Sequence, residues 1–239
     1  MTIALVTGSQ RGIGLEVVRQ LAQQGLTVIL TGRNLDKAQA AAAALQADGL
    51  DVRAKALDVV DTASVQQLAH NITAEFGVLD ILINNAAHFA PWTETASTAD
   101  LAAVHQLLET NLFGAWRVTQ AFLPLIRRSA SGRIVNVSSG GGSHSDLQFG
   151  LTTNGGTSAS YGISKAALNA LTVKLAVELA GTGILVNAVC PGLTATSPGM
   201  EAMGARPISL GAAGVVWAAL LSQDGPTGGF FRDGQPLGW

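Results

Sequence analysis

Tyr161 and Lys165 lie four positions apart in the stretch YGISK. Residues at this spacing share one face of a helix, so the lysine ammonium group would lie near the phenol. A free phenol titrates near pH ~10, and a neighbouring cation lowers its pKa toward neutrality. We therefore expect Tyr161 to act as a general acid or base. The same pair also occurs by chance on surface helices, as a packing tyrosine and a solvated lysine, so the motifs around it decide the interpretation.

A glycine-rich turn, TGSQRGIG, follows the first predicted strand and opens the first predicted helix. It contains Gly8, Gly12 and Gly14. Glycine permits positive φ and close approach of a phosphate, and the helix N-terminus supplies free N–H groups. Its place at the first strand–helix junction is typical of dinucleotide-binding folds. A tight turn that binds no ligand is the alternative.

The end of the second predicted strand indicates which nicotinamide cofactor is bound. Proteins that bind the unphosphorylated ribose place Asp or Glu there. This chain has Arg33 instead, and Arg11 lies in the glycine turn. Two guanidinium groups can hold a 2′-phosphate through charge-assisted bonds, so the pattern predicts NADP(H). The alternative is two solvated surface charges. Asp58, after the third predicted strand, is either an acceptor for the adenine amino group or a helix cap.

The composition argues against several classes of protein. The 239 residues carry a formal net charge of −2, which does not fit a broad basic surface for nucleic acid. No apolar stretch approaches the about 18 residues that cross a membrane, and the N-terminus runs directly into a predicted strand, so we expect neither a membrane span nor a signal peptide. Scattered histidines and a lone cysteine, Cys190, argue against a metal site and an internal disulfide. The lone cysteine suits the cytoplasm.

Short apolar runs alternate with longer helical patterns along the chain. The predicted strands are Ile3–Thr7, Val28–Thr31, Val52–Ala56, Ile81–Asn84, Arg133–Val137, Leu185–Cys190 and Gly229–Arg232. The predicted helices are Gly12–Gln24, Leu35–Ala47, Thr62–Phe76, Leu101–Arg127, Tyr161–Ala180 and Leu210–Leu221. Asn34 and Asp61 are expected N-caps, and Gly25 and Gly77 are expected helix ends. Nearly all-apolar strands that alternate with helices predict a parallel sheet covered on both faces.

Two features depart from this regular alternation. Residues 138–160 are rich in Gly, Ser and Thr and carry few helix or strand signals; long segments of this kind are functional lids or disordered. The helices at 101–127 and 161–180 have few charges on any side, which predicts burial on more than one face. Only 13% of residues are charged, against roughly 25% in an ordinary domain. We therefore expect a homo-oligomer, a dimer or tetramer, formed through these two helices.

Taken together, the motifs resemble the short-chain dehydrogenase/reductase family. The matching segments occur in the family's order and extend over nearly the whole chain: TGxxxGxG at 7–14, Asn84-Asn85-Ala86-Ala87, Asn111, Ser139, Tyr161-x-x-x-Lys165 and Pro191-Gly192. The segments 111–114 and 229–233 are similar to carbonyl-reductase-like members. The resemblance implies one Rossmann-type α/β domain over residues 1–239, with a doubly wound, seven-stranded parallel sheet and helices on both faces.

The resemblance also implies reversible hydride transfer between a nicotinamide and a carbonyl or secondary alcohol. Tyr161 would donate a proton, and Lys165 would lower its pKa and bind the nicotinamide ribose. Ser139 would hold the carbonyl oxygen, and Asn111 would support a water chain to Lys165. The implied cofactor-binding residues are Gly8, Gln10, Arg11, Gly12, Ile13, Gly14, Arg33, Asp58, Val59, Asn85, Ala86, Tyr161, Lys165, Pro191, Gly192, Thr194 and Thr196.

Some of these roles have simpler alternatives. Adjacent residues alternate in direction, so Ser138 competes with Ser139 for the site, although family alignment favours Ser139. Asn111 within a helix would otherwise be an exposed side chain. Cys190 is expected to be a small buried apolar residue rather than a nucleophile.

Two features differ from the family's pattern. Ala87 stands where the family usually has glycine, a mild change that narrows the approach to the cofactor. Ser139 and Tyr161 lie 22 positions apart, which is farther than in most members. We expect the additional residues to form a loop at 140–160 that lines the substrate entrance together with the segment 193–209.

The substrate is expected to be a neutral ketone or aldehyde, because no lysine or arginine is evident among the predicted lining residues. The candidates for an apolar lining are Phe89, Trp92, Phe149, Leu151, Met200 and Met203; ordinary loop packing is the alternative. Two other functions remain open. Reduction of a carrier-bound 3-oxoacyl group would require a basic docking patch, which is not identifiable. A non-catalytic NADP(H) sensor is disfavoured because all four catalytic residues are present.

Overall fold

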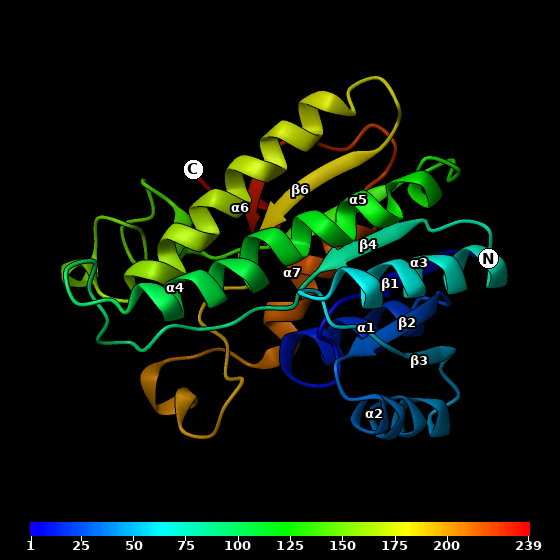
Figure 1. Ribbon diagram of the computed structural model, residues 1–239, viewed down its shortest axis with the longest axis horizontal. Helices are drawn as coiled ribbons and strands as arrows, with labels where there is room; N and C mark the ends of the chain where they lie inside the picture. Colours follow the sequence, from blue (N-terminus) through cyan, green and yellow to red (C-terminus); the bar gives the residue numbers. More distant parts are fainter.

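The computed structural model describes residues 1–239, and its strands form one sheet in the order β3-β2-β1-β4-β5-β6-β7-β8 (Figure 1). The strands are β1 (Ile3–Val6), β2 (Thr27–Gly32), β3 (Val52–Ala56), β4 (Ile81–Asn84), β5 (Arg133–Val137), β6 (Leu185–Val189), β7 (Phe230–Arg232) and β8 (Gln235–Pro236). Strands β1 to β7 pair in parallel, which confirms the expected parallel sheet.

The eighth strand is a correction to the predicted count of seven. β8 pairs antiparallel with β7. Asp233 and Gly234, which join the two strands, both have positive φ, of 55° and 72°. Two consecutive residues of this conformation make the tight turn of a β-hairpin, and Asp-Gly is a favoured pair for it.

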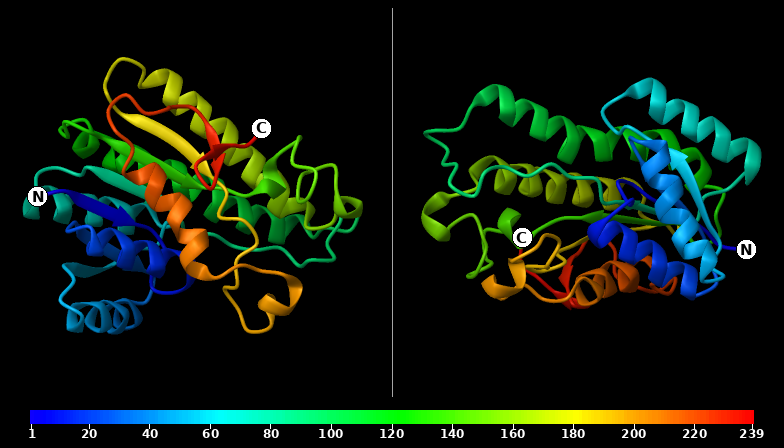
Figure 2. Two further views of the ribbon diagram at one scale, coloured as in Figure 1. Left: turned by 180° about the vertical axis from the view of Figure 1, so that it is seen from behind. Right: turned by 90° about the horizontal axis from the view of Figure 1, so that it is seen from below.

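The helices lie in two layers, one on each face of the sheet (Figure 2). They are α1 (Gly12–Gln23), α2 (Leu35–Ala47), α3 (Thr62–Glu75), α4 (Leu101–Leu108), α5 (Ala115–Ile126), α6 (Ala159–Glu178) and α7 (Ile208–Ala219). Buried residues of α3, α5 and α6 share one apolar cluster with the sheet, and those of α1, α2 and α7 share the other. The doubly wound arrangement is confirmed.

Successive side chains of a strand point to opposite faces of the sheet, so each central strand contributes to both apolar clusters. Leu5, Leu82 and Ile134 stand in register on neighbouring strands and belong to the cluster beneath α3, α5 and α6. The next residues along the same strands belong to the opposite cluster. A strand buried on both faces needs an uninterrupted apolar run, and this is why the strands could be predicted from the sequence.

The predicted helix at 101–127 is interrupted. A π-helical turn, η1 (Glu109–Gly114), separates α4 from α5. Gly114 has no room for a side chain there, since a Cβ would lie 2.8 Å from Val59 Cγ2 and 3.1 Å from the carbonyl oxygen of Glu109. π-Helical turns inside helices are found mostly at functional sites, and Asn111 lies in this one.

The segment at 140–160 is held by specific contacts. It contains two 3₁₀ turns, η2 (Gly140–Gly142) and η3 (Asn154–Gly156). The Ser143 hydroxyl donates to the carbonyl of Gly238 at 2.6 Å, and the His144 amide donates to that of Trp239 at 3.0 Å. The loop is therefore attached to the C-terminus of the chain. No helix of the fold combines the length and apolarity that a membrane crossing requires.

Candidate active site

The glycine turn lies where the strand order reverses, between β1 and β4. Ligands of open α/β sheets bind outside the carboxyl ends of the strands at such a point. Gly8 has φ +61°, and a Cβ on it would lie 2.9 Å from Ala86 Cα. A Cβ on Gly14 would lie 2.8 Å from Ser9 Cα. Glycine is required at both positions, which leaves the turn's backbone open to a phosphate.

Asn85 supports this turn. Its Nδ2 donates to the carbonyls of Thr7 at 2.9 Å and Gly8 at 3.1 Å. The backbone amides of Asn85 and Ala86 both donate to the Thr7 hydroxyl oxygen, at 2.9 and 3.0 Å. The segment after β4 is therefore bonded to the end of β1. The Asn85 side chain therefore holds the glycine turn in place. The position of Asn85 against the cofactor stays a prediction.

Gln10, Arg11 and Arg33 are the candidates for holding the phosphorylated ribose of NADP(H). Arg11 and Arg33 are exposed and form no ion pair. Gln10 places a buried Oε1 without a hydrogen-bond partner against Gly32, where a Cβ would overlap it. Buried polar atoms normally have partners. The unpaired oxygen and the two unpaired guanidinium groups are suited to hydroxyl and phosphate groups of a ligand.

Asp58 and Val59 follow β3 at the same edge. Asp58 Oδ1 accepts from the backbone amide of Val60 at 3.2 Å, while the cap of α3 is Asp61. Asp58 therefore does not cap the helix, which removes the alternative role considered for it. The Val59 carbonyl accepts from Arg117 Nη1 at 2.7 Å, and the Val59 side chain packs against the π-helical turn at Gly114.

Arg206, which the sequence did not single out, shapes the segment after β6. Its guanidinium donates to the carbonyl of Pro191 from two nitrogens and pairs with Asp233. Gly192 has φ +71°, which favours glycine, and a Cβ there would lie tightly against this guanidinium, at 3.0 Å. The Thr194 hydroxyl donates to the carbonyl of Pro191 at 3.1 Å. This hydroxyl therefore contributes to the shape of the turn.

Thr196 brings the same segment close to the glycine turn. Its Cγ2 would lie 3.8 Å from a Cβ on Gly12. Its hydroxyl contacts Met200 Sδ at 3.7 Å. The segments after β1 and after β6, far apart in the chain, thus meet at one end of the sheet, as the predicted cofactor site requires.

Ser139, rather than Ser138, faces the reacting centre. Ser138 is buried and donates to Asn169 Oδ1 at 2.6 Å. The Ser139 Oγ accepts from the Gly141 amide at 3.1 Å and lies beside the Tyr161 phenol. The Ser139 hydroxyl oxygen accepts this hydrogen bond through one of its lone pairs. Its O–H group remains free to donate to an acceptor such as a carbonyl oxygen.

Tyr161 and Lys165 lie together on α6, as predicted. Lys165 Nζ is 5.6 Å from the centroid of the Tyr161 ring and donates to the carbonyl of Val137 at 2.8 Å. Burial lowers the pKa of Lys165 to about 8. Although part of the Tyr161 ring is accessible, burial also raises the pKa of the phenol above its usual value, while Ser139 acts in the opposite direction. The expected lowering of the pKa of Tyr161 by Lys165 is not found in this structure, since desolvation raises this pKa and the opposing contribution comes from Ser139.

Asn111 is buried, which excludes the exposed alternative. Its Oδ1 accepts from the His88 amide at 2.7 Å, and its Nδ2 donates to the His88 carbonyl at 2.9 Å and to the Ser164 hydroxyl at 3.0 Å. Ser164 is adjacent to Lys165 and donates to the carbonyl of Tyr161 at 2.7 Å. Asn111 thus ties the π-helical turn to α6 and to the segment after β4; a water chain to Lys165 stays a prediction.

Two aromatic residues flank the reacting centre. The Phe89 ring stacks on that of Tyr161, with centroids 5.1 Å apart and an angle of 20° between the planes, and it remains 63% exposed. The Phe149 ring lies beneath the guanidinium of Arg232, at 5.7 Å. Trp92 and Met203 are also largely exposed. Of the predicted lining residues, Phe89 thus contacts Tyr161 directly, the Phe149 carbonyl lies near Gly141, and Leu151 lies against Gly162.

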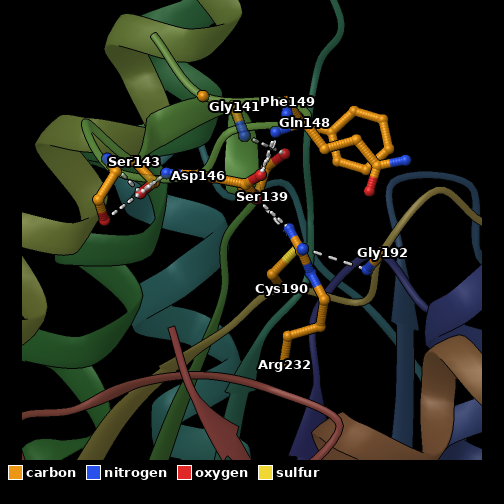
Figure 3. Close-up of polar contacts among 12 residues, drawn as sticks. Ser139, Gly141, Ser143, Asp146, Gln148, Phe149, Cys190, Gly192 and Arg232 are labelled. Carbon is orange, nitrogen blue, oxygen red and sulfur yellow. Dashed lines mark hydrogen bonds and ion pairs between the residues drawn. The ribbon is translucent and has the colours of Figure 1, made fainter. Parts of the chain in front are cut away.

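A charged cluster behind Ser139 was not predicted. Figure 3 shows the guanidinium of Arg232, from β7, between Cys190 and the turn that follows Ser139. Arg232 pairs with Asp146, whose carboxylate is buried. Cys190 is buried, as expected. No three residues among His, Cys, Asp and Glu lie close enough together, here or elsewhere in the structure, to hold a metal ion.

Comparison with known proteins agrees with this geometry. Residues 2–205 match the model of the short chain dehydrogenase family, and the chain belongs to that family. It is 34% identical to the NADPH carbonyl reductase 1 of Sus scrofa over 99% of this chain and 94% of that protein. It is 35% identical to the 3-oxoacyl-acyl-carrier-protein reductase of Escherichia coli, over 81% of this chain and 74% of that protein. The structure of an NADPH-bound carbonyl reductase from chicken fatty liver superimposes with a TM-score of 0.86 at 28% identity, covering 100% of this chain and 98% of that chain.

Charge reversal at Arg33 tests the cofactor assignment. Arg33→Asp is expected to lower the ratio of kcat/KM with NADPH to kcat/KM with NADH by about 10- to 100-fold, because each charged hydrogen bond to a phosphate contributes about 1.5–3 kcal/mol. Arg127→Asp, which reverses another exposed and unpaired arginine, is the matched control and should leave the ratio unchanged. Equal use of both cofactors by the unmodified protein would contradict the assignment.

The lowered pKa of Lys165 predicts a pH dependence of stability. The folded protein releases this proton near pH 8, whereas the unfolded chain keeps it to about pH 10. Between these values the unfolded state binds more protons, so folding stability rises with pH. Relative to Lys165→Met, the wild type should gain about 2 kcal/mol of unfolding free energy between pH 7 and 9.5, measured by urea denaturation. Lys174→Met, at an exposed position on α6, is the control. Parallel pH curves for wild type and Lys165→Met would show that the buried amine does not titrate in this range.

Proposed function

We propose that this protein is an NADP(H)-dependent oxidoreductase that reduces a ketone or aldehyde to an alcohol. The observation that carries the proposal is the convergence of Ser139, Tyr161 and Lys165 at the end of the sheet that also holds the glycine turn and two unpaired arginines. The similarity to NADPH carbonyl reductases over nearly the full length of both chains supports it.

NADPH, when bound, supplies the hydride that the carbonyl carbon accepts. The Ser139 hydroxyl, already accepting from Gly141, donates to the carbonyl oxygen. Tyr161 holds the proton that this oxygen takes up, and the raised pKa of the phenol keeps it protonated at neutral pH. Lys165, fixed on the carbonyl of Val137, holds a positive charge close to the Tyr161 ring and favours the phenolate once the proton has left.

A neutral, moderately apolar substrate fits the surroundings of Tyr161. Phe89 and Phe149 offer aromatic surface. The two arginines that the fold brings to this end of β7, Arg206 and Arg232, are both ion-paired within the chain. Neither is free to bind a substrate carboxylate or phosphate, which supports a neutral ketone or aldehyde and speaks against an anionic carrier arm.

The chain is proposed to act as one domain over residues 1–239, with the loop 140–160 and the segment 193–209 at the substrate entrance. The loop reaches the reacting centre through Phe149, and the segment approaches the glycine turn through Thr196. The single cysteine, buried and unpaired, supports a reducing cytoplasmic location.

The alternative of a non-catalytic sensor makes a different prediction. Such a protein would need the cofactor site but not the arrangement around Tyr161. In the structure the Lys165 ammonium donates to the carbonyl of Val137, and the Gly141 amide donates to the Ser139 hydroxyl, which lies beside the Tyr161 phenol. Two separate hydrogen bonds that hold Lys165 and Ser139 next to this phenol favour catalysis.

Removal of the phenol hydroxyl tests the proposal directly. Tyr161→Phe should lower kcat for ketone reduction by about 10²- to 10⁴-fold, the usual contribution of a general acid, with NADPH binding retained. The assay follows NADPH absorbance with a panel of ketones and aldehydes, and NADPH binding is measured separately by fluorescence. Full activity of the variant would overturn the acid–base assignment. Tight NADPH binding by the wild type without turnover of any substrate would favour the sensor.

We also propose that the protein forms a homo-oligomer through α4, α5 and α6. In Figure 1, α4 and α5 follow one another along one line, and α6 lies beside them. These helices carry exposed large apolar side chains, among them Trp116 (41% exposed) and Val177 (69% exposed). Exposed apolar surface on neighbouring helices is typical of a protein–protein interface.

Light scattering tests the oligomeric state. The wild type is expected to have at least twice the mass of one chain, and the double variant Trp116→Glu/Val177→Glu is expected to be shifted toward the monomer, because buried charges destabilise an interface. Leu147→Glu, at a 92% exposed position on the 140–160 loop, is the control that should keep the wild-type mass. A monomeric wild type would contradict the proposal.

A further inference from the structure

Cys190 receives four hydrogen bonds at a single buried sulfur. The backbone amides of Gly140 and Gly192 donate to Sγ at 3.1 and 3.3 Å, and Nε and Nη2 of Arg232 donate at 3.4 Å each. Gly140 follows Ser139 directly, and Gly192 belongs to the segment after β6. One sulfur therefore connects the serine turn, the cofactor side of the site and strand β7.

Arg232 continues this network to the 140–160 loop. Its Nη2 pairs with Oδ2 of Asp146, a side chain that is only 3% exposed. The other carboxylate oxygen of Asp146 accepts from the amides of Gln148 at 2.9 Å and Phe149 at 3.1 Å. The guanidinium also covers the Phe149 ring at 5.7 Å. Both acceptors of this half-buried guanidinium, Asp146 and Cys190, thus contact Gly140, the residue after Ser139.

The ion pair of Arg232 and Asp146 lies against the turn at Gly140 and Gly141, which follows Ser139. A Cβ on Gly140 would overlap both the Asp146 carboxylate and the Arg232 guanidinium, so the pair occupies the space above the Gly140 Cα. The next residue, Gly141, holds Ser139 Oγ through its amide and approaches the Phe149 carbonyl, which would lie 3.6 Å from a Cβ on Gly141. A displacement of the pair would therefore be transmitted to Ser139 from two sides.

We propose that Arg232 is a positioning residue for the reaction: through Asp146 and Cys190 it holds the Gly140–Gly141 turn so that the Ser139 hydroxyl points at the substrate oxygen, and it holds Phe149 against the substrate. The proposal rests on the catalytic role proposed for Ser139. The guanidinium donates from Nη2 to both Asp146 and Cys190 and from Nε to Cys190, and its rigid plane fixes these donors relative to one another, which the rotatable ammonium of a flexible lysine chain does not.

Arg232→Lys tests the proposal while keeping the charge that Asp146 needs. Displacement of a polarising group by about 1 Å can cost on the order of 100-fold in rate. We expect kcat/KM for a ketone substrate to fall by about 10- to 100-fold, mainly in kcat, with the Kd for NADPH changed less than about 3-fold. Arg53→Lys, which replaces an arginine paired with Glu75 at the edge strand β3, is the matched control and should keep wild-type kinetics.

Thermal unfolding of each variant is followed in parallel, and kinetics are measured well below the lowest transition. If Arg232→Lys does not fold, Asp146→Asn replaces it. The asparagine keeps an oxygen for the amides of Gln148 and Phe149 but loses the charge that orients Arg232.

A double-mutant cycle with Ser139→Ala separates positioning from general stabilisation. If Arg232 acts through Ser139, Arg232→Lys should lower kcat much less in the Ser139→Ala background than in the wild type, because the hydroxyl it positions has gone. The proposal would be overturned if Arg232→Lys lowered kcat equally in the two backgrounds, or if it lowered kcat and the affinity for NADPH equally. Arg232 would then only stabilise the folded structure. If Ser139→Ala itself keeps full activity, the assignment of Ser139 fails, and this outcome is distinct from the failure of Arg232 alone.

Discussion

A seam of three polar contacts between β5 and α6 determines where the reacting groups lie. Asn136 donates to the Thr172 hydroxyl at 2.9 Å, Lys165 donates to the Val137 carbonyl at 2.8 Å, and Ser138 donates to Asn169 at 2.6 Å. The α6 residues of the seam are spaced by four and three positions and share one helix face. A shift of the helix along the strand would leave a buried ammonium and two buried amides unpaired, at a cost of several kcal/mol. The seam therefore fixes Tyr161, on the next turn of α6, relative to Ser139.

The seam continues into the half of the sheet that would hold the cofactor. Asn84, the last residue of β4, donates to Asn136 at 2.9 Å and to Thr119 on α5 at 3.0 Å. The following residue, Asn85, is bonded to the end of β1 through Thr7. Buried amides thus connect the carboxyl ends of three neighbouring strands in a row. Because each of these groups needs its partner, the glycine turn and the reacting tyrosine are held in one rigid frame across strands that are distant in sequence.

The sequence predicted the features whose signals are local. Nearly all-apolar strands, the caps Asn34 and Asp61, and the spacing of Tyr161 and Lys165 are visible within a few residues, and each was found where expected. The π-helical turn was missed because it follows from contacts of Asn111 with His88 and Ser164, which leave no trace in helical periodicity. The pair of Arg232 and Asp146 spans 86 positions, and no spacing rule relates two such residues. The pKa of Tyr161 could not be predicted either, because desolvation depends on the complete fold.

Burial shifts the pKa of both Tyr161 and Lys165, and in each case it favours the neutral form. It raises the pKa of Tyr161 and lowers that of Lys165 to about 8. At pH 7 the phenol therefore keeps its proton while most of the lysine remains charged. A protonated phenol is ready to donate to a developing alkoxide but cannot accept a proton from an alcohol. Oxidation would require prior loss of that proton, which the buried phenol resists and which becomes still harder when Lys165 loses its charge above pH 8. Burial therefore keeps the resting site in the state that carbonyl reduction starts from, with a protonated phenol beside a charged lysine.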